Sequence, residues 1–295
     1  MSLTKRNHFN PCFWSALWNE TYHSHFMAGE ESKLRARESQ LIFLEINSNT
    51  ILRLKADDVF FEKGLGLAEI TQEKALEFCR RHHADRYEEF SKDVESNPET
   101  LILDFENIFS GLEQMPIYTT MINSARTGKI ETDMDKSWIA FFTTHHQLRS
   151  HAYLQNLFEA YEAKGRAKFE ALIELKWALS RKDFMTEETV SAFRRKWTLY
   201  RTPRKIIPLS DAPIVGTPKM QFVTIAPDTL ITIEYYNADG LGVEYGSRIP
   251  THVYNLFLRT ISKYATKGLV FSTEKAAEKW RESAAWKARR KEFVG

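Results

Sequence analysis

Five polar residues spread over most of the chain have side chains suited to chemistry: His8, His146, Arg149, Asp211 and Asn255. An imidazole titrates near neutral pH and can move a proton. A guanidinium holds a phosphate or carboxylate at two points, a carboxylate orients a histidine or binds a metal, and an amide fixes a substrate oxygen. Drawn together by the fold, these side chains would suit hydrolysis or transfer at a phosphodiester.

Each of these residues also has a structural explanation. His8 can hydrogen-bond a chain end, and Asp211 can cap a turn ahead of Pro213. Arg149 can pair with Asp211 as a structural ion pair. Two functions therefore stay open. One is a hydrolase of nucleic acid or nucleotides, such as a toxin or defence nuclease. The other is a non-catalytic binding or scaffold protein, whose polar pocket holds the fold together or recognises a small anion or a partner.

The element that must position His146 and Arg149 is the segment from Met134 to Tyr161. Neither Pro nor Gly interrupts it, and apolar side chains recur at steps of three and four residues, so we predict one long helix. Phe142, His146, Arg149 and Tyr153 then fall on one row of that helix. A row that passes from apolar to cationic to aromatic is typical either of a polar pocket or of a buried helix face whose edge contacts solvent.

Strand-like patterns lie on both sides of this helical middle. Gln40–Ile46 and Ile51–Lys55, with Asn and Ser residues between them, predict a hairpin. From about Trp197 the chain is rich in β-branched and aromatic residues punctuated by Pro and Gly, which predicts an antiparallel sheet. Further helices are predicted over the ranges Thr71–Ser96, Thr100–Ser124 with an interruption near Pro116, Lys168–Ser180, Glu187–Arg195 capped by Thr186, Pro250–Thr266 and Thr273–Glu292.

The fold class expected from this order is α+β, a helical core with a mixed or antiparallel sheet formed by N-terminal and C-terminal strands. We expect one composite domain over residues 1–295. Its parts are an N-terminal motif and hairpin (1–66), a helical middle (67–196), a β-rich segment (197–247) and C-terminal helices (248–295).

The composition is that of a core-forming protein, with 43% hydrophobic and 27% charged residues. With 41 basic and 39 acidic residues the formal net charge is only +2, so any attraction to nucleic acid must come from a local patch. Two cysteines do not make a disulfide scaffold, and no apolar run approaches the ~20 residues of a membrane span. The expectation is a cytoplasmic protein without membrane contact.

Metal and cofactor signals are weak, and the sequence assigns no cofactor. Cys12 lies four residues after His8, and His23 and His25 follow, so a zinc site is conceivable, although the spacing matches no standard finger. The alternative is a partly exposed aromatic segment that contains histidines. The other histidines of the helical middle are expected at the surface of charged helices: His82, His83 and His151.

The C-terminal helix interleaves Lys and Arg residues with Trp280 and Trp286, a pattern that can grip a nucleic-acid backbone. Acidic residues offset its first half, and both tryptophans can serve as packing anchors, so a solvated amphipathic helix explains the pattern better. No Walker loop, Gly-x-Gly-x-x-Gly or Gly-x-Ser-x-Gly motif is present.

Several short motifs follow one another over residues 7 to 272. They are His8-Phe-Asn-Pro11 with Trp14 after it, His146-Gln-Leu-Arg149, Ser210-Asp-Ala-Pro213, Ile225-Ala-Pro-Asp-Thr-Leu-Ile231, and Asn255 in a late helix. This order resembles an uncharacterised bacterial family, the domain of unknown function numbered 4238. One departure is that His146 stands where that family has Gln, although Gln147 is adjacent. The resemblance implies architecture and candidate positions, because the family has no settled activity to carry over.

Overall fold

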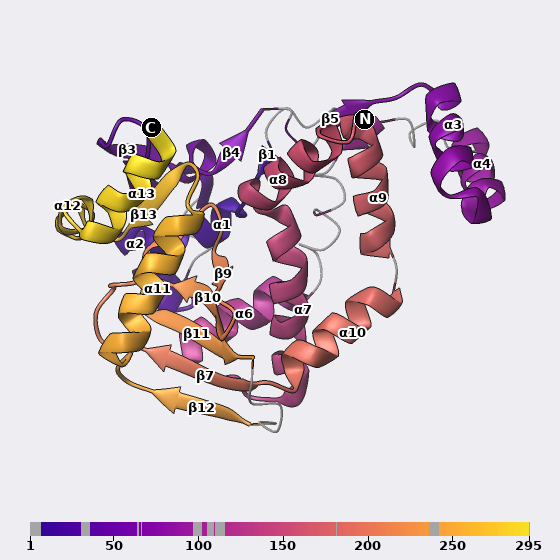
Figure 1. Cartoon of the computed structure of the whole chain (residues 1–295). Coiled ribbons are helices and arrows are strands. Elements are labelled where there is room, and N and C mark those ends of the chain that lie inside the picture. Colours follow the sequence, from indigo (N-terminus) through magenta and orange to yellow (C-terminus); the bar gives the residue numbers. More distant parts are fainter. Residues whose placement is uncertain are drawn as a thin grey trace.

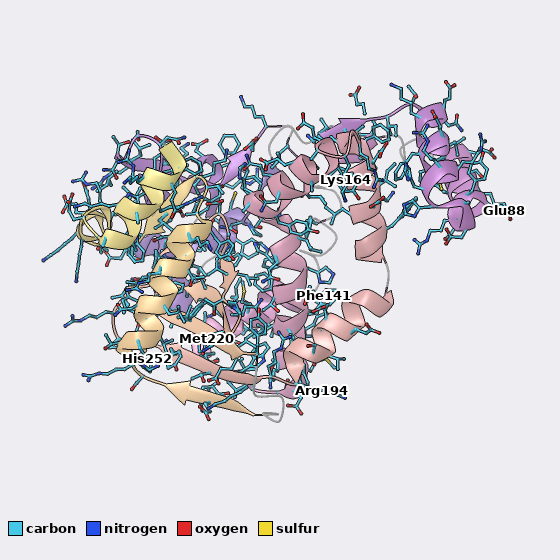
Figure 2. All side chains as sticks on the ribbon, viewed as in Figure 1. Glu88, Phe141, Lys164, Arg194, Met220 and His252 are labelled. Atoms are coloured by element: carbon cyan, nitrogen blue, oxygen red, sulfur yellow. The ribbon has the colours of Figure 1, made fainter. Side chains whose placement is uncertain are left out.

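The structure, a computed structural model, describes residues 7–30, 36–63, 65, 67–96, 102–104, 109, 116–180, 182–235 and 242–294. The predicted α+β class is confirmed, since helices pack around two larger sheets (Figure 1). Side chains fill the space between the helices and the sheets (Figure 2). No helix in these ranges is long and apolar enough to cross a membrane.

The larger sheet has the strand order β12-β7-β11-β10-β9, and all its neighbours are antiparallel except the parallel pair β12 and β7. Its strands are β7 (Lys196–Arg201), β9 (Ile214–Gly216), β10 (Met220–Ala226), β11 (Thr229–Glu234) and β12 (Val243–Gly246). Side chains alternate between its two faces, as the pleat requires. Phe222 belongs to the core beneath helix α11 (Thr251–Tyr264), whereas Val223 belongs to the core shared with helix α7 (Asp133–Arg149).

The second sheet is fully antiparallel, in the order β3-β2-β13-β8. It contains the predicted hairpin, β2 (Gln40–Glu45) and β3 (Ile51–Lys55), together with β8 (Leu209–Ser210) and β13 (Gly268–Phe271). The prediction that N-terminal and C-terminal strands share a sheet is therefore confirmed. Two-stranded pairs join β1 (Asn7–His8) to β4 (Phe61–Glu62) and β5 (Leu67–Glu69) to β6 (Ile102–Asp104).

The predicted single helix over Met134–Tyr161 is wrong, because the chain breaks at Ser150 into α7 and α8 (His151–Glu162). Ser150 has an extended ψ of 143°, and its hydroxyl accepts from the Tyr153 backbone N–H at 3.3 Å. A serine in this position caps the helix that follows it. Tyr153 therefore belongs to a different helix from His146 and Arg149.

The other helices are α1 (Cys12–Ser15), α2 (Glu20–Met27), α3 (Gln72–His82), α4 (Tyr87–Ser96), α6 (Pro116–Thr127), α9 (Lys168–Ser180), α10 (Lys182–Phe193), α12 (Glu274–Arg281) and α13 (Ala284–Val294). The side chains of Thr71 and Thr273 cap α3 and α12. Four predictions are wrong. The predicted helices over 71–96 and 273–292 are each divided in two, into α3 and α4 and into α12 and α13. The segment after Thr100 contains strand β6, and its helix begins only at Pro116; α10 begins before Thr186, which therefore lies within it.

The N-terminal segment is fixed to the C-terminal half of the chain by buried indoles. Trp14 donates from Nε1 to the Ile225 carbonyl at 2.8 Å, and Trp18 donates from Nε1 to the Ile207 carbonyl at 2.7 Å. Both tryptophans are buried, so each of these bonds satisfies a polar group that has no access to water. The first helical turn thus becomes part of the central core.

Gly268 opens β13 at a place where there is no room for a side chain. A Cβ there would lie 2.3 Å from the Leu44 carbonyl oxygen and 2.6 Å from the Phe43 ring. We therefore expect Gly268→Ala to lower the free energy of unfolding by roughly 1–3 kcal/mol, measured by urea denaturation. Gly242→Ala is the matched control, since a Cβ at Gly242 meets nothing within 4 Å. Equal stability of the two variants would contradict this expectation.

Candidate functional site

His146 lies at the centre of a buried group formed by Tyr118, His146, Asn10 and Ser210, the His146 group. Its Nε2 donates to the Asn10 amide oxygen at 3.1 Å, and its Nδ1 accepts from the Tyr118 hydroxyl at 3.2 Å. Asn10 in turn donates to the Ser210 carbonyl at 2.8 Å. Burial, reinforced by the positive charge of Arg149, holds the pKa of His146 well below its usual range. The ring is therefore neutral, and both of its nitrogens are occupied.

Within the His-x-x-Pro motif, Asn10 is the residue that reaches this group. The backbone of His8 pairs with Phe61 between β1 and β4, while the side chain of His8 lies outside the described part of the structure. Asn10 is buried and bridges α7 to the residue next to Asp211. Asn10 was not among the predicted site residues, although it lies inside this motif, two residues before the start of α1.

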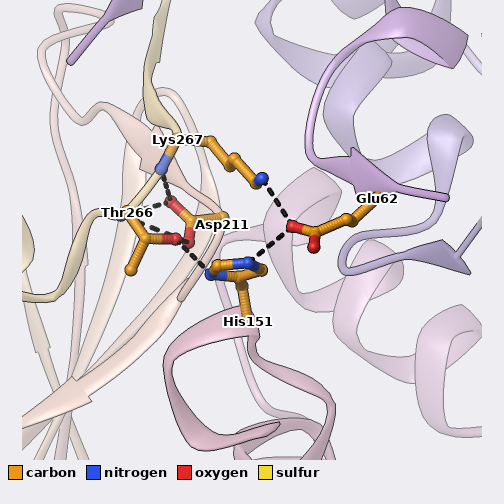
Figure 3. A network of polar contacts seen from close by, with 5 residues as sticks. All are labelled: Glu62, His151, Asp211, Thr266 and Lys267. Carbon is orange, nitrogen blue, oxygen red and sulfur yellow. Dashed lines mark hydrogen bonds and ion pairs between the residues drawn. The ribbon is translucent and has the colours of Figure 1, made fainter. Parts of the chain in front are cut away.

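Asp211 lies in a second, adjoining set, the Asp211 network, which consists of Glu62, His151, Asp211, Thr266 and Lys267 (Figure 3). Its buried carboxylate accepts from the Thr266 backbone N–H at 3.0 Å, from the Thr266 hydroxyl at 2.6 Å and from the Lys267 backbone N–H at 3.3 Å. The turn ahead of Pro213 is instead held by the Ser210 hydroxyl, which bonds to the N–H and C=O of Ala212. Asp211 thus ties the end of β8 to the start of β13.

His151 is the middle of the Asp211 network, and the prediction that it lies at the surface is wrong. It is 7% exposed, and its ring packs edge-on against Phe9 with centroids 5.0 Å apart. Since the Thr266 hydroxyl has one hydrogen and donates it to Asp211, the His151 Nδ1–H donates to Thr266 Oγ1 at 2.7 Å. His151 Nε2 lies 2.7 Å from a Glu62 carboxylate oxygen. His151 therefore connects the two carboxylates.

Glu62 closes the network at its more exposed end. Its carboxylate also accepts from the Lys267 ammonium at 2.6 Å. Partial burial acts to raise the pKa of Glu62, but the hydrogen bonds and positive charges of Lys267 and His151 outweigh it and leave that pKa below its usual value. The carboxylate stays ionised at neutral pH and is shared by two donors.

The structure brings some of the predicted site residues together and leaves one apart. His146 connects to the residue before Asp211 through Asn10. Arg149 is buried on the same helix as His146, with its guanidinium 5.3 Å from the centre of the Phe109 ring. Asn255 is exposed on α11 and makes no side-chain hydrogen bond to another described residue. His146, Arg149 and Asp211 therefore lie in the interior, and Asn255 faces solvent.

An open cavity of about 370 Å³ is lined by sequence neighbours of both polar groups. We call it the tyrosine pocket; it lies between the α7–α8 junction, β9 and the ends of β11 and α11. Its lining residues are Gln147, Ser150, Ala152, Tyr153, Asn156, Ala212, Ile214, Val215, Gly216, Thr217, Tyr235 and Tyr264. Of these described lining residues, none carries an ionisable carboxylate, ammonium, guanidinium or imidazole.

Three of the residues that line the pocket come immediately after a buried polar residue in the sequence. Gln147 comes after His146, Ala152 after His151, and Ala212 after Asp211. A residue fixed by buried hydrogen bonds also fixes the backbone of its neighbour. The His146 group and the Asp211 network therefore act as the frame of the tyrosine pocket, and none of their residues lines the pocket.

Two other predictions, a zinc site and nucleic-acid binding by the C-terminal helix, receive little support from the described residues. Among the described residues, no group of three or more His, Cys, Asp or Glu is placed to hold a metal ion. Trp280 and Trp286 are buried, and Trp286 donates to Asn49 at 2.9 Å, as expected for packing anchors. Arg289 and Arg290 donate to backbone carbonyls of the body, which engages two of the cations of the basic helix.

Comparison of the chain with known protein families, with characterised proteins and with solved structures finds no match. The resemblance to the domain of unknown function numbered 4238 stays a prediction.

Proposed function

We propose that this protein is a non-catalytic binding protein that captures a small uncharged ligand in the tyrosine pocket. The observation that carries the proposal is that the ionisable groups lie in the frame, whereas the residues that line the pocket are uncharged. His146, His151 and Asp211, the groups suited to acid–base chemistry, are buried and hydrogen-bonded to other protein groups. The cavity beside them offers aromatic rings, amides and hydroxyls.

The state of His146 argues against its use as a catalytic base. A general base must come within hydrogen-bond reach of the proton it removes. His146 is buried, donates to Asn10 and accepts from Tyr118, so it has no nitrogen to offer a substrate. Asp211 is fully buried and receives three donors. These arrangements are those of structural polar groups.

The tyrosine pocket has the properties of a preformed binding site. Ligand pockets are concave, mostly apolar, on the order of 300–1,000 Å³, and carry a few fixed polar groups. This one is at the small end of that range at about 370 Å³. The absence of charge among its described lining residues favours an uncharged ligand, since an ionic group would lose its hydration there without a partner.

Binding and turnover measured side by side test the proposal. Calorimetry with nucleosides and monosaccharides is run in parallel with turnover assays on RNA, DNA and nucleotides, with and without Mg²⁺ or Mn²⁺. We expect at least one uncharged compound to bind and no substrate to be consumed. A Cβ at Gly216 would lie 3.4 Å from the Tyr235 hydroxyl, so alanine fits there and leucine fills the pocket. Gly216→Leu is expected to weaken binding at least tenfold.

Gly242→Leu controls for the added side chain, because nothing lies within 4 Å of a Cβ at Gly242. Gly216→Ala shows whether the fold accepts a side chain at position 216. Consumption of RNA, DNA or a nucleotide by the wild-type protein, lost in a folded Arg149→Ala variant, would overturn the proposal and favour the phosphodiester hydrolase.

A further inference from the structure

We infer that the ligand of the tyrosine pocket is a nucleobase, with adenine preferred. This inference rests on the proposed function and names the ligand class. Three features of the pocket carry it: accessible aromatic rings, two unengaged carboxamides, and the lack of charged groups.

The aromatic rings provide surfaces for stacking. Tyr153 and Tyr264 are 36% and 38% exposed and provide these surfaces. Tyr235 is half-buried beside Gly216, and the Arg195 guanidinium already lies over its ring, 4.3 Å from the ring centre, so Tyr235 contributes mainly its hydroxyl. Burial raises the pKa of Tyr153 and, as the main cause, that of Tyr235, so both phenols are neutral at physiological pH. A planar base stacked on an aromatic side chain gains about 1–3 kcal/mol, and every base has such a face.

The carboxamides provide the edge contacts. Gln147 is half-buried and Asn156 is exposed, and both line the pocket. Within the described ranges, neither side-chain amide hydrogen-bonds to another part of the protein. A carboxamide presents one donor and one acceptor side by side, which matches the amino group and ring nitrogen of adenine and supplies about 1–3 kcal/mol of discrimination. Gln147 is the better placed of the two, because the neighbouring His146 is fixed in the frame.

The lack of charge sets the orientation of the ligand. A nucleobase is uncharged at neutral pH, whereas a phosphate would need cations that the described lining residues do not supply. The base therefore enters the pocket, and the sugar with any phosphate remains outside. Both a free nucleoside and a base from a single strand can bind in this way.

The test is calorimetric titration of the full chain with adenosine, purine riboside, AMP, a single-stranded oligoadenylate and N-acetylglucosamine. Purine riboside stacks like adenosine but lacks the amino group. We expect adenosine to bind, purine riboside to bind about tenfold more weakly, and Gln147→Leu to remove that difference. Gln155→Leu is the matched control, since Gln155 is exposed on α8 and does not line the pocket.

The remaining ligands separate the possible outcomes. Similar affinity for adenosine, AMP and the oligonucleotide supports a free nucleoside or nucleotide as the source of the base, while much tighter binding of the oligonucleotide supports a single strand. Binding of the amino sugar, lost in Gly216→Leu, with no binding of adenosine would overturn the nucleobase and leave the proposed function standing. Binding of none of the probes, together with nucleic-acid turnover, would overturn both.

Discussion

Replacing Asp211 by alanine is expected to lower the free energy of unfolding by roughly 3–5 kcal/mol. The substitution leaves the backbone N–H groups of Thr266 and Lys267 and the Thr266 hydroxyl without their acceptor in a buried site. Each buried donor left unpaired costs about 1–3 kcal/mol. His151 also loses the anion at the far side of Thr266. Urea denaturation followed by circular dichroism measures the loss.

Two further variants make this result specific to the hydrogen bonds. Asp211→Asn keeps the shape and one acceptor oxygen but turns an amide toward donors, so we expect an intermediate loss of about 2 kcal/mol. Asp85→Asn, at an exposed position, should change stability by less than about 0.5 kcal/mol. A loss below 1 kcal/mol for Asp211→Ala, with an unchanged denaturant slope, would show that Asp211 is not part of the frame.

Acid is expected to destabilise the protein well before its carboxylates protonate. Burial lowers the pKa of His145 to about 4 from 6.5, against the raising effect of its hydrogen bond to the Phe141 carbonyl, and the pKa of His146 lies well below 6.5. In the unfolded chain His145 and His146 therefore bind protons near pH 6.5, whereas in the folded chain both rings stay neutral at that pH. Stability is complete above that pH and falls as the pH drops through the window, by roughly 3 kcal/mol between pH 6.5 and 5 for the pair.

The pH dependence is measured as the free energy of unfolding in urea at half-unit steps. His145→Gln and His146→Gln are each expected to remove about half of the slope in this window, whatever their effect at pH 7.5. His252→Gln is the control, because His252 is exposed on α11. A wild-type stability that stays flat from pH 7 to pH 5 would mean that both rings accept protons in the folded state.

Local signals in the sequence were sufficient for much of the fold. The hairpin of β2 and β3 shows as two apolar strands around a polar turn, and α9 has the predicted bounds. The break at Ser150 could not be foreseen, because apolar spacing continues across it and serine costs little inside a helix. The extended backbone of Ser150 and its hydrogen bond to Tyr153 mark the new start in the structure.

The candidate site was only partly predictable for a similar reason. His146, Arg149 and Asp211 were selected by residue type, and all three are buried. His151 looked like a surface residue because polar residues surround it in sequence. Its burial depends on Phe9, Thr266 and Glu62, which are far away along the chain. Tyr153 was noted on the predicted helical row, but Tyr235 and Tyr264 carried no local motif, and only the tertiary arrangement brings the three together.

The anchoring of the first helical turn bears on how the chain folds during synthesis. Asn10, Trp14 and Trp18 find their partners 200, 211 and 189 residues further along. Such pairings close very long loops and are intrinsically slow to form. During synthesis on the ribosome, the two indole N–H groups have no native acceptor until more than two thirds of the chain has been made. Until then the segment exposes apolar side chains, which makes it a natural target for chaperones that hold newly made chains.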